Sequence, residues 1–258
     1  MTDLALYTTE NRVAYITISR PEKRNALNPE LVESLTDLFL RAGHDDEVKV
    51  VVLRAEGEVF SAGADLEYLQ KLQNNSSQDD LEDTIAIKEL LWSIYTLPKL
   101  VVAQVEGHAI AGGCGLAAVC DVVYAVPEAK FGYTEVRIGF VPALVSCFLV
   151  RKLGEGRVKE LLLSGDLIDA ATASSYGLIN FVAAKAEIAG MVRSYAERMA
   201  VSVSGQSVAL TKQLIHKAQN ISLEDSLEEA IKLNVQTRSS EDCKKGIASF
   251  LNKEKLGW

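Results

Sequence analysis

Short apolar runs alternate with helical stripes along the first half of the chain. Runs rich in β-branched residues predict strands over 13–18, 48–53, 100–105 and 122–125. Between the first two, Asn28 is expected to cap a helix and Pro29 to open it. The apolar stripe of that helix comprises Leu31, Leu35, Leu38, Phe39 and Ala42. This succession of strand, helix and strand predicts an α/β fold with right-handed crossovers.

From residue 181 onward the pattern becomes wholly helical. Helices are predicted over 186–200, 206–219, 223–237 and 241–253, with Ser222 and Asp225 as an acidic capping arrangement for the third. Their apolar stripes have to be buried either on the chain's own core or on a neighbouring subunit, and the pattern leaves both open.

The stretch 70–80 is polar, with Asn, Ser, Gln and Asp residues in succession. It predicts a surface segment that joins two helices. A plain linker fits this composition better than a flap over a ligand site.

Composition and charge restrict the classes of protein. At 258 residues, with 48% hydrophobic and 24% charged residues, the chain can bury a sizeable core. Its apolar runs, such as 100–105 and 140–150, fall short of the ~20 residues of a membrane helix. Residues 1–12 lack the pattern of a signal peptide, so a cytoplasmic protein is expected. The net charge of -8 argues against nucleic-acid and anionic-membrane partners.

The four cysteines do not have the spacing or the histidine partners of a zinc site. They are expected to be buried free thiols. No metal is predicted.

Two glycine-containing turns, over 60–66 and 107–115, lie where a strand is expected to end and a helix to begin. Such turns expose backbone N–H groups at a helix N-terminus, which can hold negative charge. One N–H from each turn could bind a thioester oxygen as it becomes an enolate oxygen. Small residues at such junctions also serve close packing, so each turn taken alone is weak evidence.

A third segment, 131–140, places the carboxylate of Glu135 among apolar and glycine neighbours. Burial there would raise its pKa toward the range that suits proton exchange near neutral pH. The general alternative is a solvated surface carboxylate.

These motifs together resemble the crotonase, or enoyl-CoA hydratase/isomerase, superfamily. The resemblance rests on Ser19-Arg20-Pro21 followed by Asn25-Ala26-Leu27, on both glycine turns, and on 131–139. It implies a crotonase-like spiral of ββα units over residues 1–195, with the active site, and a C-terminal helical trimerisation region over 196–258. A homotrimer or homohexamer is expected.

Carried over by position, the resemblance makes the Ala64 and Gly112 amides the oxyanion donors and Glu135 a catalytic acid/base. It implies contacts to an acyl-CoA substrate from Lys23, Arg24, Ala26, Ala62, Asp65, Leu66, Gly113 and Thr134. Asp65 is expected to cap the following helix rather than react. No cofactor is implied, because CoA is part of the substrate.

One position departs from the family pattern. Hydratases with a glutamate pair carry their first glutamate where this chain has Gly115. Hydration with Glu135 alone and isomerisation of a 3-enoyl-CoA to a 2-enoyl-CoA both remain possible. The run 134–139 with Pro142, Ala143 and Ser146 resembles methylglutaconyl-CoA hydratases, which favours a hydratase acting on a branched substrate. A non-catalytic acyl-CoA-binding or structural subunit is the alternative of another class.

Overall fold

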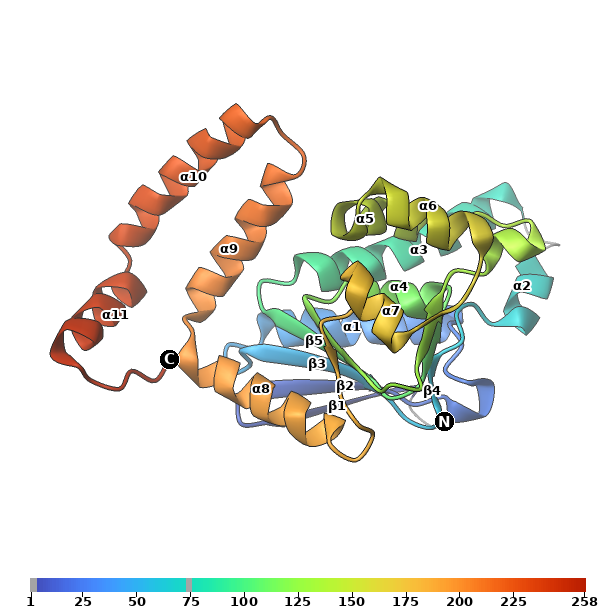
Figure 1. The fold of residues 1–258 in the computed structure, drawn as a ribbon, viewed down its shortest axis with the longest axis horizontal. Coiled ribbons are helices and arrows are strands. Elements are labelled where there is room, and N and C mark those ends of the chain that lie inside the picture. Colours follow the sequence, from blue (N-terminus) through green and yellow to red (C-terminus); the bar gives the residue numbers. More distant parts are fainter. Residues whose placement is uncertain (1–3, 73–75) are drawn as a thin grey trace.

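The structure is a computed structural model that describes residues 4–72 and 76–258. Its larger sheet lies in the lower part of the body in the view of Figure 1. In it β1 (Ala5–Glu10) pairs antiparallel with β2 (Val13–Ile18). The parallel strands β3 (Val50–Ala55), β5 (Leu100–Val105), β7 (Val122–Ala125) and β10 (Phe181–Val182) follow in that order. The four predicted strands are confirmed, with β3 shifted two residues toward the C-terminus.

A smaller sheet lies beside the first. It contains the parallel strands β4 (Val59–Ser61), β6 (His108–Ile110) and β8 (Lys130–Gly132), with β9 (Ile168–Asp169) antiparallel to β8. The chain repeatedly passes from a strand of the larger sheet to one of the smaller sheet and then into a helix. The predicted α/β spiral of ββα units is therefore confirmed.

The predicted capped helix is α1 (Pro29–His44). The Asn28 side chain accepts a hydrogen bond from the Leu31 amide at 3.1 Å, and Pro29 occupies the first turn. Its stripe is buried as predicted, except for Leu38, which is only partly covered.

The remaining helices of the body enclose the smaller sheet and cover the larger one. They are η1 (Pro21–Lys23), α2 (Leu66–Leu72), α3 (Ser77–Thr96), α4 (Gly112–Ala118), η2 (Glu135–Ile138), α5 (Ala143–Leu153), α6 (Glu155–Ser164), α7 (Ala170–Tyr176) and α8 (Ile188–Ser202). α8 packs across β2, β3, β5 and β7. Part of the hydrophobic core therefore lies between α8 and the larger sheet.

The polar stretch 70–80 does join two helices, as predicted, but most of it is helical itself. Residues 70–72 end α2, and Ser76 caps α3 through a reciprocal capping box with Asp79. The polar residues of this stretch therefore lie largely at the end of α2 and the start of α3 rather than in a long linker. Residues 73–75 lie outside the described part of the chain.

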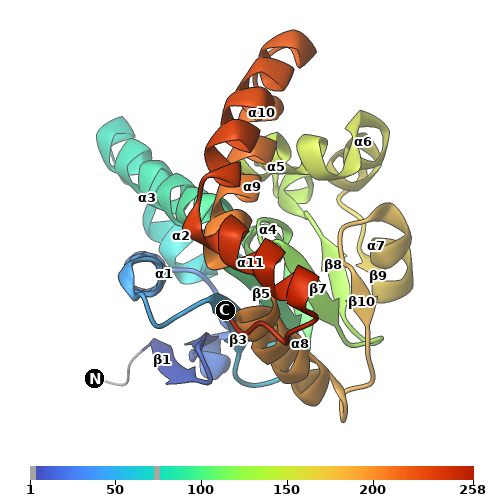
Figure 2. The same cartoon turned by 90° about the vertical axis from the view of Figure 1, so that its left-hand side faces the viewer.

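The last three helices form an arm that extends away from the body (Figures 1 and 2). They are α9 (Gly205–Ala218), α10 (Leu223–Arg238) and α11 (Glu241–Asn252), close to the predicted bounds. Ser222 accepts from the Asp225 amide, as its capping role requires. The division into 1–195 and 196–258 stays a prediction, and α8 crosses it while packing on the sheet as far as Ala200.

The thiols differ from expectation. All four are free, but only Cys114 and Cys120 are buried; Cys147 is exposed and Cys243 partly exposed. Apolar neighbours in a helix sequence do not reveal which face is covered, which explains the error. Within residues 4–72 and 76–258, no helix has the length and apolarity to cross a membrane.

Candidate active site

Each of the three predicted reactive groups follows one of three neighbouring strands of the smaller sheet. β4, β6 and β8 pair in parallel, and the turns that follow them carry Ala64, Gly112 and Glu135 respectively. Because the carboxyl ends of parallel neighbours meet at one edge of a sheet, the three groups converge on that edge.

The two glycine turns are in direct contact. Gly63 has φ +87°, and a Cβ placed on it would lie 2.8 Å from the Ala111 Cβ and 3.4 Å from the Gly112 nitrogen. A Cβ on Gly113 would lie 2.4 Å from the Ser61 carbonyl oxygen. The distances of 2.8 and 2.4 Å are shorter than real Cβ contacts, so a side chain at either position would force its neighbours to shift. Close packing, one of the two alternatives raised by the sequence, is thus a role of these glycines.

Each turn presents an amide without a protein partner. Among the described residues, neither the Ala64 nor the Gly112 N–H donates a hydrogen bond. Gly112 is the first residue of α4, where helix amides have no intrahelical acceptor. The preceding Ala111 has φ 50°, which is unusual for a residue with a side chain. Strain of this kind beside two available donors is typical of a functional turn.

Glu135 opens η2, directly after Thr134. Its side chain is half-buried, and one carboxylate oxygen, Oε2, is buried without a hydrogen-bond partner in the described residues. Burial raises the pKa of Glu135 above its usual 4.5, although a backbone hydrogen bond partly opposes the rise. A carboxylate in this condition is suited to accept and return a proton.

Cys114 is a buried thiol in α4. Burial raises the pKa of this thiol to about 12, and the charge of Glu135 adds to the rise. The Gly132 carbonyl, three residues before Glu135, accepts from the Ala111 amide at 2.8 Å. These relationships tie the Glu135 segment to the start of α4.

Apolar side chains fill the space beside Gly115, where hydratases with a glutamate pair carry their first glutamate. Gly115 is buried, and the side chains of Val145 in α5 and Leu91 in α3 face its Cα. On this side the site has an apolar wall in place of a proton-transfer group.

The residues expected to bind the substrate fall into two groups. The first group lies on two adjoining segments that run from the end of η1 and up to the start of α2. It comprises Lys23, Arg24, Ala26, Ala62, Asp65 and Leu66. In the second group, Gly113 lies in α4 and Thr134 directly precedes η2. Lys23 pairs with Glu67 at 2.5 Å, Arg24 is exposed, and Leu66 is 73% exposed. The Asp65 carboxylate is buried and accepts from the Glu67 and Tyr68 amides, so its predicted capping role is confirmed.

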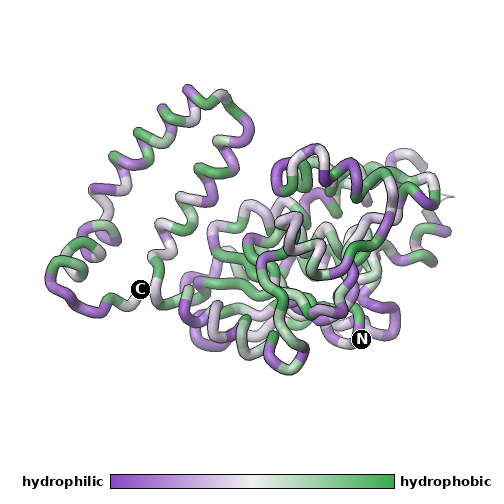
Figure 3. Tube along the Cα trace, in the orientation of Figure 1, coloured by the Kyte–Doolittle hydropathy of each residue, from purple (hydrophilic) through white to green (hydrophobic). Residues whose placement is uncertain are grey.

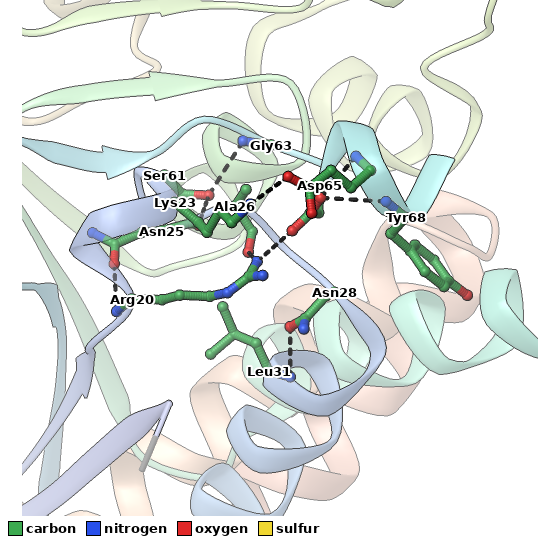
Figure 4. A network of polar contacts seen from close by, with 11 residues as sticks. Arg20, Lys23, Asn25, Ala26, Asn28, Leu31, Ser61, Gly63, Asp65 and Tyr68 are labelled. Atoms are coloured by element: carbon green, nitrogen blue, oxygen red, sulfur yellow. Dashed lines mark hydrogen bonds and ion pairs between the residues drawn. The ribbon is translucent and has the colours of Figure 1, made fainter. Parts of the chain in front are cut away.

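Sequence reasoning missed the scaffold beneath the Ala64 turn. Asn25 is fully buried and donates to the carbonyls of Glu56 and Val59. Ser61, which lies next to Asn25 in Figure 4, donates from its Oγ to the Asn25 carbonyl. A polar residue in a polar loop carries no signal that it is buried, because only the fold covers it. No cluster of three or more metal-ligating side chains occurs within residues 4–72 and 76–258.

Known proteins share this architecture along the whole chain. The family model described as enoyl-CoA hydratase/isomerase matches residues 8–258. The chain is 39% identical to a Thermus thermophilus protein assigned as an enoyl-CoA hydratase, with 95% of this chain and 96% of that protein covered. It is 33% identical to (E)-benzylidenesuccinyl-CoA hydratase of Thauera aromatica, with 93% of both covered. The crystal structure of an enoyl-CoA hydratase from Mycobacterium smegmatis superposes with a TM-score of 0.91 at 27% identity, covering 99% of this chain and 98% of that one.

Proposed function

Because this chain belongs to the enoyl-CoA hydratase/isomerase family, we propose that it hydrates a 2-enoyl-CoA with Glu135 as its only acid/base. The observation that carries the proposal is the convergence of Ala64, Gly112 and Glu135 at the ends of β4, β6 and β8. An acyl-CoA thioester offers an oxygen for the two amides and an activated C3 for water.

The proposed reaction uses one carboxylate twice. Glu135 takes a proton from water as the water oxygen bonds to C3, and the electron pair moves to the thioester oxygen. The amides of Ala64 and Gly112 stabilise this enolate, and one such donor typically contributes ~3 kcal/mol to lowering the barrier. Protonated Glu135 then returns its proton to C2, so the product is a 3-hydroxyacyl-CoA. The raised pKa of Glu135 suits both steps.

The proposed substrate-binding residues lie around the same edge of the smaller sheet. In this proposal Lys23 and Arg24 bind the CoA nucleotide, Ala26, Ala62 and Leu66 line its path, and Gly113 and Thr134 contact the acyl end. Asp65 contributes by holding the turn in place, because its carboxylate and its backbone N–H are both engaged within the protein. The apolar wall formed by Val145 and Leu91 beside Gly115 favours a hydrocarbon substituent on the acyl chain, as in methylglutaconyl-CoA.

Isomerisation of a 3-enoyl-CoA is the second candidate, and the hydrocarbon at Gly115 favours it. An isomerase needs one base that moves a proton from C2 to C4 and has no need to orient water. The test is to offer crotonyl-CoA, 3-methylglutaconyl-CoA and a 3-enoyl-CoA to the purified protein and to follow product mass. A gain of one water identifies the hydratase, and a shifted double bond at unchanged mass identifies the isomerase. No turnover of any of the three would contradict both candidates.

We also propose that the arm formed by α9, α10 and α11 assembles the chain into a homotrimer or homohexamer. Apolar residues recur along α10 and α11 (Figure 3), and several of them are exposed. They are Leu223, Leu227, Ile231, Val235, Phe250 and Leu251, each more than half exposed. Exposed apolar residues gathered on neighbouring helices usually mark a protein interface.

A further inference from the structure

A buried ion pair lies next to the proposed oxyanion donor. Arg20 Nη1 and Asp65 Oδ2 are 2.7 Å apart, and their side chains are only 12% and 7% exposed (Figure 4). Arg20 also donates to the Ala26 carbonyl at 2.9 Å. Asp65 directly follows Ala64, so the pair joins the loop around residues 20–28 to the turn that carries the amide.

Backbone hydrogen bonds fix both neighbours of Ala64 to the same loop. The Leu27 amide donates to the Gly63 carbonyl at 2.7 Å, and the Asp65 amide donates to the Leu27 carbonyl at 2.8 Å. The Ala64 amide lies between these bonds and makes none of its own among the described residues. Its direction is therefore set by how the 20–28 loop is held.

Helix capping alone does not account for the pair. Asp65 Oδ1 accepts from the Glu67 and Tyr68 amides at 2.9 and 3.3 Å, which already satisfies the start of α2. A neutral Asn would cap as well. Burying two charges costs desolvation free energy that their attraction barely repays, so stability is a weak reason for them.

The charge of Asp65 has a chemical consequence for its neighbour. A carboxylate one residue from Ala64 opposes the negative charge that develops on the thioester oxygen, and buried charges are poorly screened. Arg20 neutralises that carboxylate. Burial would raise the pKa of Asp65, but the hydrogen bonds from Arg20, Tyr68 and Glu67 outweigh it and hold the pKa below its usual range. Asp65 is thus ionised at neutral pH and depends on Arg20 for compensation.

We infer that Arg20 and Asp65 are positioning residues of the active site: they aim the Ala64 amide, and Arg20 shields the enolate from the carboxylate of Asp65. This inference rests on the proposed role of Ala64 as an oxyanion donor. It predicts an asymmetric pattern, in which loss of Arg20 alone is worse than loss of Asp65 or of both.

The experiment compares Arg20→Met, Arg20→Lys, Asp65→Asn and the double variant Arg20→Met/Asp65→Asn in the full chain. Glu155→Gln is the matched control, because its pair with Lys159 is exposed on α6 at 2.5 Å and includes no residue of the proposed site. Two readouts are used: kcat and KM with the enoyl-CoA that the wild type turns over, and the absorption of bound 4-(dimethylamino)cinnamoyl-CoA. Polarisation of that thioester carbonyl by hydrogen bonds shifts its absorption to the red, so the shift reports on the oxyanion donors directly.

Arg20→Met should lower kcat roughly 10- to 100-fold, less than the ~10²–10³-fold for loss of a donor, while KM changes by less than about 3-fold. It should also lose most of the red shift. Arg20→Lys should recover part of both, and the double variant should exceed Arg20→Met in both. Glu155→Gln should match the wild type.

A wild-type red shift and kcat in Arg20→Met would overturn the inference, as would a double variant worse than either single one. If Arg20→Met does not fold, Arg20→Lys and the charge-free double variant decide by the same criteria. Failure of the proposed function is distinguishable, because the wild type would then bind the chromophore without any red shift.

Discussion

The Cγ1 atom of Val145 lies 2.6 Å from the point where a Cβ would stand on Gly115. Where hydratases with a glutamate pair carry their first glutamate, this chain thus has a glycine, and a side chain from α5 fills the space beside it. The two positions are 30 residues apart in sequence, so restoring a carboxylate requires changing both.

Gly115→Glu alone should destabilise the protein by at least about 1–3 kcal/mol, because it overpacks this contact and buries a charge. Its hydratase activity should not rise. Gly115→Glu with Val145→Ala should recover part of the stability and hydrate crotonyl-CoA faster than the single variant. Urea unfolding and product mass measure the two effects, and a fully stable, faster single variant would contradict the packing argument.

Activity should fall in acid because Glu135 must be ionised to accept a proton from water. Burial raises its pKa above 4.5, so the acid limb of kcat/KM should have its midpoint above 4.5. A pH–rate profile between pH 4 and 9 checks this. A midpoint at or below 4.5 would indicate a solvated carboxylate.

The same shift has a consequence for stability. A carboxyl whose pKa is higher in the folded state favours folding below its unfolded pKa, and this contribution is lost as pH rises through the folded pKa. Glu135→Gln should therefore raise the melting temperature at pH 8, and the difference should disappear below about pH 4. Melting curves at several pH values test it, with the opposite sign at pH 8 as the contrary result.

Gly63→Ala should damage both folding and catalysis. The residue has φ +87°, and the added methyl group would meet Ala111 at 2.8 Å, so a cost of about 1–3 kcal/mol is expected with a lower kcat. Gly190→Ala is the control, because nothing lies within 4 Å of its added methyl in α8. That variant should be as stable as the wild type or up to ~1 kcal/mol more stable. Equal stability of the two variants would argue against contact between the turns.

A charge on the arm should weaken assembly without changing the fold of the body. Leu227, 56% exposed on α10, is replaced by Glu, and the exposed Glu224→Gln on the same helix is the control. Light scattering after size exclusion should show a smaller species for Leu227→Glu only. An unchanged molar mass would place the interface elsewhere.

Local sequence patterns predicted the helices and strands well, but they did not predict which residues the fold buries. The Asn28 cap, the stripe of α1 and the arm helices were predictable because periodicity and capping are local properties. The motifs around Ala64, Gly112 and Glu135 were also visible, and only the pairing of β4, β6 and β8 shows that they share an edge. The burial of Asn25, the contact of Val145 with Gly115 and the exposure of Cys147 depend on distant segments, so no local pattern could reveal them.

In the proposed mechanism, one carboxyl group next to two backbone amides moves every proton in the reaction. The most direct test is the turnover of Glu135→Gln with the enoyl-CoA that the wild type accepts, measured beside the dissociation constant for that thioester. We predict a loss of about 10²–10⁴-fold in kcat with little change in binding, because the amide is isosteric but cannot exchange the proton. Turnover equal to that of the wild type would exclude Glu135 as the acid/base.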